Sequence, residues 1–126
     1  AARLSPGVSP RERSFYLEAL GDAEYLAGRP TEAAAAYLEA LRGVRGQPLR
    51  EAHLALKQTL VEQRRGHYSN ALRQASLGLR AVSDTTGPEA GAIRARLQAR
   101  YAFCRMQQGR YTDARRWAER GLAEGE

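Results

Sequence analysis

Apolar residues recur every three or four positions along most of this chain, a spacing that places them on one face of an α-helix. Breaks that contain Gly or Pro divide the pattern into six stretches. The expected helices cover residues 10–27, 31–42, 48–65, 69–82, 88–108 and 112–123. Because no stretch alternates apolar and polar residues as a half-buried strand does, the sequence predicts an all-α protein.

Capping residues mark where these helices begin. Ser9 precedes Pro10 and stands three positions before Glu12, which makes a capping box with proline at the first helical position. Thr31 and Ser69 are the expected N-caps of the second and fourth helices. The loop SDTTGP at residues 83–88 is the clearest turn, and its proline opens the fifth helix.

One short motif occurs three times: GRPTEA from Gly28, GHYSNA from Gly66 and GRYTDA from Gly109. In each copy the glycine supplies the positive φ of a tight turn, and the alanine five residues later allows close helix packing (Ala33, Ala71, Ala114). The glycines lie 38 and 43 residues apart, which is the period of a helical solenoid. We therefore expect one domain, residues 1–126, with helix pairs at about 10–44, 48–83 and 88–124.

The stretch LEALGDAEYLAGRPTEAAAAYLEAL, residues 17–41, resembles the tetratricopeptide repeat (TPR) family. Pro30 departs from the family pattern, which has an aromatic residue at that position, and the first helices of the second and third copies match less well. The resemblance implies a right-handed solenoid of three antiparallel helix pairs that binds a protein or peptide. The long repeats are similar to arrays attached to bacterial signal-transduction ATPases and transcriptional activators, which implies a regulatory or scaffold role.

In a TPR array the first helix of each pair lines a concave groove. The resemblance places these residues on its wall: Phe15, Glu18, Asp22, Tyr25, His53, Leu56, Leu60, Gln63, Arg96, Arg100, Phe103 and Met106. The wall would be acidic in the first repeat and basic in the third, so it would orient an acidic segment of a partner. The alternatives are a solvated helix face for the two acidic residues and core packing for the aromatic and methionine side chains.

Charge is unevenly distributed along the chain. The net charge of +6 comes from residues 48–126, where 14 basic residues face 8 acidic ones. A solvated arginine-rich surface explains this excess, and so does an anionic partner. A nucleic-acid-binding or regulatory domain of a bacterial transcription factor is therefore the alternative to a protein-binding module, although no module typical of nucleic-acid readers is visible.

Catalytic and metal-binding patterns are weak. His53 and His67 have no evident partner, and Cys104, the single cysteine, fits a buried packing position better than a reactive thiol. We expect no enzyme activity, no metal site and no cofactor.

Sequence features also bear on location and self-association. The N-terminus has neither a signal-peptide layout nor an initiator Met, and no apolar run is long enough to cross a membrane, so we expect a cytoplasmic piece of a longer protein. The expected last helix carries Tyr111, Trp117 and Leu122, and its apolar surface suggests self-association through the terminal helices.

Overall fold

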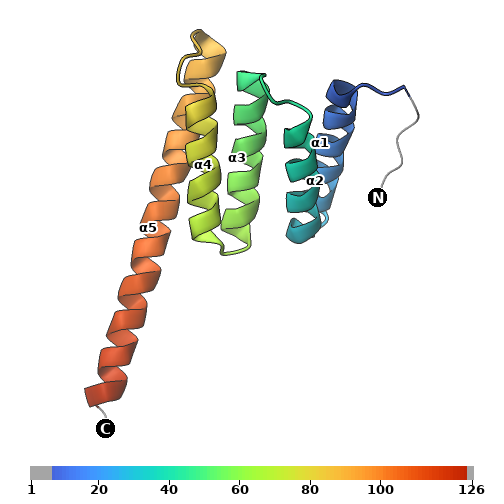
Figure 1. The fold of residues 1–126 in the computed structure, drawn as a ribbon. Coiled ribbons are helices and arrows are strands. Elements are labelled where there is room, and N and C mark those ends of the chain that lie inside the picture. The colour runs from blue at the N-terminus through green and yellow to red at the C-terminus, as the bar shows by residue number, and fades with distance from the viewer. Residues whose placement is uncertain (1–6, 125–126) are drawn as a thin grey trace.

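The computed structural model describes residues 7–124, and the described chain is entirely helical, with no strand (Figure 1). Its five helices are α1 (Pro10–Leu26), α2 (Pro30–Arg42), α3 (Pro48–Arg64), α4 (Tyr68–Ala81) and α5 (Pro88–Glu124). The all-α prediction is confirmed. The terminal residues 1–6 and 125–126, which belong to the expected domain of residues 1–126, lie outside the described part, as does the side chain of Trp117.

The first helix begins as the capping box predicts. The Ser9 backbone is extended, and its side chain accepts a hydrogen bond of 3.1 Å from the backbone N–H of Glu12. The caps expected at Thr31 and Ser69 are wrong, because α2 and α4 each begin one residue before the hydroxyl. In α2 the first helical residue is Pro30, whose fixed φ suits that position.

The first two repeat glycines form the expected turns. Gly28 has a φ of 78° and Gly66 a φ of 76°, a conformation that L side chains rarely adopt. Each turn is closed by a hydrogen bond across it, from the N–H of Arg29 to the carbonyl of Glu24 (2.9 Å) and from the N–H of His67 to the carbonyl of Glu62 (2.8 Å). The chain thus makes two helix pairs, α1–α2 and α3–α4.

The third repeat glycine makes no turn, so the prediction of a separate sixth helix is wrong. Gly109 lies inside α5, where Thr112 Oγ1 donates a hydrogen bond of 3.0 Å to the carbonyl of Gln108 in the preceding turn of the same helix. Continuing a helix through glycine costs only about 1 kcal/mol relative to alanine. The far half of α5 therefore extends beyond the other helices instead of folding back (Figure 1).

Burial of the motif alanines follows from this difference. Ala33 and Ala71 are fully buried, as expected, and Ala33 shares a core cluster with Leu17 of its partner helix α1. The equivalent Ala114 is exposed, because no helix folds back over it. Close packing also explains Gly78, since a Cβ there would lie 2.9 Å from the Cβ of Ala55.

Helix α3 lies at the centre of the molecule and packs against α2, α4 and α5. One buried cluster joins it to the first pair, and a second joins it to α5. Leu54 and Val61 belong to the first cluster, and Leu56 packs with Ile93 and Leu97 in the second. α3 therefore fixes the positions of the first pair and of α5 relative to each other, and functional side chains could gather on the surfaces of these helices.

Candidate partner-binding face

The groove-wall residues lie on α1, α3 and α5, and an ion-pair network joins the first two of these helices. Glu18 accepts from Arg50 Nη1 at 2.5 Å and from Lys57 Nζ at 2.6 Å. Lys57 Nζ also lies 2.9 Å and 3.0 Å from the two carboxylate oxygens of Asp22. Both carboxylates are therefore paired with cations of α3, although the Asp22 side chain is still 45% exposed and that of Glu18 only 14%.

This network shifts the protonation of its members. Burial raises the pKa of Glu18, but hydrogen bonds and charge from Lys57 and Arg50 outweigh it and hold the pKa below its usual value. Burial lowers the pKa of Lys57, but hydrogen bonds and charge from Glu18 and Asp22 outweigh this effect, so the pKa of Lys57 lies above its usual value. Tyr37 has a raised pKa because it is buried and donates a hydrogen bond of 2.6 Å to Asp22. The lowered pKa of Glu18 and the raised pKa of Lys57 both favour the charged forms of these two groups.

Two aromatic side chains of α1 are covered by arginines of α3. The guanidinium of Arg50 lies 4.2 Å from the ring centre of Phe15, and that of Arg64 lies 4.9 Å from the ring centre of Tyr25. Phe15 is nevertheless 49% exposed. Phe15 thus contacts α3 from the outer surface, whereas Tyr25 is partly buried and packs against the core cluster shared by α1, α2 and α3.

The residues expected from the second repeat divide between surface and core. Leu56 is buried and Leu60 packs against the same cluster, so neither lies open on a groove wall. His53 Nε2 lies 3.6 Å from a carboxylate oxygen of Glu89, at the start of α5. Gln63 donates a hydrogen bond of 2.9 Å to Gln107. These polar contacts join α3 to α5.

The residues expected from the third repeat are exposed together on α5. Arg96 and Arg100 are one helical turn apart, and neither forms an ion pair within residues 7–124. Phe103 and Met106 follow on the next turns and are 41% and 44% exposed. The predicted acidic end, Glu18 and Asp22, is thus neutralised by ion pairs, whereas the predicted basic end, Arg96 and Arg100, keeps its charge unpaired within residues 7–124.

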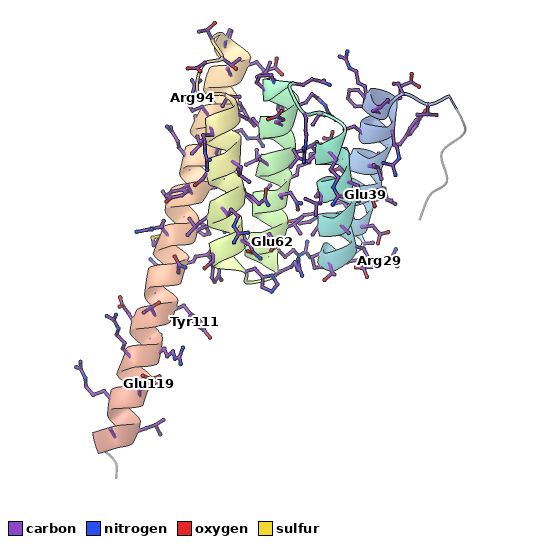
Figure 2. The ribbon with its side chains drawn as sticks, viewed as in Figure 1. Arg29, Glu39, Glu62, Arg94, Tyr111 and Glu119 are labelled. Carbon is purple, nitrogen blue, oxygen red and sulfur yellow. The ribbon has the colours of Figure 1, made fainter. Side chains whose placement is uncertain are left out.

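Another surface was missed by sequence reasoning. Two recesses on the opposite side of α3 lie between α2 and α4, and Leu38 lines both. Beneath one of them Glu62 is a buried carboxylate that accepts hydrogen bonds from Arg65 and Asn70 (Figure 2). Helical periodicity does not predict that Leu38 is exposed, because its exposure depends on the gap between α2 and α4.

Several chemical possibilities can be compared with the structure. Within residues 7–124 no three His, Cys, Asp or Glu side chains are arranged to hold a metal ion. Burial raises the pKa of Cys104, although the charge of Arg100 lowers it slightly, and the thiol is inaccessible. In the same part of the chain, no helix is both long and apolar enough to span a membrane.

Comparisons of this chain with protein-family models, with curated proteins and with solved structures give no match.

Proposed function

We propose that this chain is a non-catalytic, TPR-like interaction module that binds an acidic segment of a partner protein. The observation that supports this most is the patch on α5 formed by Arg96, Arg100, Phe103 and Met106, which we call the α5 patch. Its two guanidinium groups are close enough to contact one carboxylate or two neighbouring ones. The apolar pair beside them would accept an aliphatic or aromatic side chain of the same segment.

The balance of energies requires both parts of the patch. Exposed ion pairs contribute about 0–1 kcal/mol each, so two arginines alone would not hold a partner. Burying one apolar side chain against Phe103 and Met106 adds about 1.5–3 kcal/mol. The charges would therefore serve mainly to orient the segment, with its acidic groups toward α5.

The paired network on α1 and α3 supports the same orientation. Because Glu18 and Asp22 are already bound by Arg50 and Lys57, that end of the face offers a partner little net charge. A partner cation would have to compete with Lys57 there. The module would thus bind through α5 and use α1 and α3 as a rigid support.

The far half of α5 provides a second surface within this proposal. Tyr111 and Leu122, which are 69% and 73% exposed, each lie 18 residues after a buried residue, Ile93 and Cys104 respectively. Since 18 residues make five helical turns, they point to the side that packs against α3 and α4 higher up. Tyr111, labelled in Figure 2, lies where α5 begins to extend past the other helices, and it lines a recess together with His67 and Tyr68 at the start of α4. We assign this surface to a second copy of the chain, and sedimentation showing a monomer at high concentration would exclude it.

The positions of the two histidines and the cysteine support our proposal that the chain is not catalytic. His67 Nδ1 lies 3.3 Å from the buried Glu62, and His53 lies beside Glu89, so both histidines have structural carboxylate neighbours. Neither is placed to activate Cys104, which is buried. A cytoplasmic regulator with this module as its partner-binding part is the role that fits best.

The experiment compares two classes of anion. A fluorescein-labelled peptide of Glu-Glu-Leu triplets, its Gln-Gln-Leu counterpart and a random DNA duplex are each titrated with the chain, with anisotropy as the readout. The proposal predicts that the acidic peptide binds more tightly than the neutral one. Tighter binding to DNA, with an affinity that falls steeply with salt, would favour the nucleic-acid alternative and reject ours.

A further inference from the structure

The groove between α2 and α4 contains two adjoining recesses of different character. The first has a volume of about 380 Å³ and is lined mainly by apolar side chains, including Leu38, Leu41 and Leu77. The second has a volume of about 360 Å³ and is lined by amide and charged groups of α3 and α4 as well as by small residues of α2. Because Leu38 lines both, one ligand segment could occupy them together.

The apolar recess is open to solvent on a side of the molecule that the proposed partner site does not use. Leu38 on α2 is 44% exposed and Leu77 on α4 is 42% exposed, with Ala55 of α3 between them as the floor. Arg42 and Arg45 lie at its edge. An aliphatic side chain of a ligand would remove these leucines from water without displacing any buried group of the protein.

Two residues that line the second recess, Gln58 and Gln74, have buried amide oxygens that lack a hydrogen-bond donor within residues 7–124. Gln58 is only 4% exposed, and its Nε2 donates to the carbonyl of Ala34 at 3.2 Å, which fixes the amide and leaves Oε1 without a partner. Oε1 of Gln74, on the facing helix, is buried and without a partner as well. Buried acceptors in folded proteins are nearly always paired, with protein groups or with ordered water, so a ligand N–H that reached these two oxygens would complete their hydrogen bonding.

The charges around this recess favour an uncharged donor. Glu62 would attract a cation, but it already accepts from Arg65 at 2.7 Å and from Asn70 at 3.2 Å. The guanidinium groups of Arg65 and Arg73 line the same recess and would repel an ammonium group. A primary carboxamide, as in Asn or Gln, brings two N–H donors and no charge, which matches two orphan acceptors.

We propose that the α2–α4 groove is a second binding site, which takes a peptide segment with an aliphatic side chain in the leucine recess and an Asn or Gln carboxamide at Gln58 and Gln74. The site is independent of the α5 patch, since the two lie on different helices and on different sides of α3. The module would then recognise two features of its partners rather than one.

The test uses capped peptides in which zero to three glycines separate Leu from Gln, together with matched peptides that carry Glu or Met in place of Gln. Each is titrated into the isotope-labelled chain, and the side-chain amide signals of Gln58 and Gln74 are followed by NMR. The proposal predicts saturable shifts of both amide groups with the best Gln peptide, and affinity at least roughly fivefold weaker for the Glu and Met peptides.

Variants separate this site from the α5 patch. Gln74→Leu should remove the preference for Gln over Met, and Leu38→Ser should weaken both peptides, while circular dichroism confirms that each variant is folded. Arg96→Ala with Arg100→Ala should leave binding of these peptides unchanged. Three results would each overturn the proposal. The first is equal affinity for the Gln and Met peptides, and the second is loss of binding in the double arginine variant. The third is amide shifts that do not saturate, which would mean that only water fills the recess.

Discussion

Replacing single glycines with alanine tests whether α5 is straight or turns at Gly109. At Gly66 a Cβ would meet no atom within 4 Å, so the cost of Gly66→Ala comes only from its φ of 76° and should be about 1–2 kcal/mol. At Gly109 a Cβ also meets nothing within 4 Å, but the residue is helical, so Gly109→Ala should stabilise the helix by up to about 1 kcal/mol. Two glycines of the same sequence motif should therefore give effects of opposite sign.

The assay is urea unfolding followed by circular dichroism at pH 7, with the helical signal at low urea as a second readout. With a denaturant slope of about 1–3 kcal/mol per molar urea, a change of 1 kcal/mol moves the midpoint by about 0.3–1 M. Gly91→Ala is the matched control, because Gly91 is also exposed, helical and free of close neighbours in α5. Gly109→Ala could instead lower the stability as much as Gly66→Ala does. That result would mean that the chain turns at Gly109, and it would refute the conclusion that α5 continues through this residue.

Three further results are expected. Gly21→Ala should destabilise the first pair by about 1–3 kcal/mol in the same assay, because its Cβ would lie 2.5 Å from the ring of Tyr37; an unchanged midpoint would show that the pair is looser than described. The lowered pKa of Glu18 contributes stability above its unfolded-state pKa that is lost as pH falls through the folded value, so Glu18→Gln should flatten the decline of the unfolding midpoint between about pH 7 and pH 3. The raised pKa of Lys57 has the converse effect, since its contribution is lost only as pH rises through the folded value. Cys104 should react with a thiol reagent roughly tenfold or more slowly in the native chain than in urea, and equal rates would contradict its burial.

Local signals in the sequence were sufficient to predict the beginning of α1 and the first two turns. Ser9 and the glycines at 28 and 66 act on the backbone within a few residues, so their effect does not depend on the rest of the fold. Gly109 has the same local pattern, yet α5 continues through it. A glycine costs a helix about 1 kcal/mol relative to alanine, and a hairpin forms there only if the packing between its two helices outweighs the alternative of one continuous helix. That packing depends on residues outside the six-residue motif, so the motif alone does not predict it.

The candidate site was predictable only in part for the same reason. Helical spacing groups Arg96 with Arg100, and both residues are exposed on α5. It gave no sign that the only lysine, Lys57, would reach Glu18 and Asp22 from 35 or more residues away, because that contact depends on where the packing of α2 places α1 relative to α3. The orphan amides of Gln58 and Gln74 are likewise visible only when three helices are placed together.

The most direct test of the proposed partner site is isothermal titration of the acidic Glu-Glu-Leu peptide against two double variants with equal loss of charge. Arg96→Ala with Arg100→Ala removes the guanidinium groups of the α5 patch. Arg105→Ala with Arg116→Ala removes two exposed arginines of the same helix, and Arg105 lies nine residues, or two and a half turns, from Arg96 on the opposite side. The first pair should weaken binding roughly tenfold and the second by less than about twofold. Equal losses from the two pairs would mean that the peptide is held by overall charge and that α5 has no specific binding face.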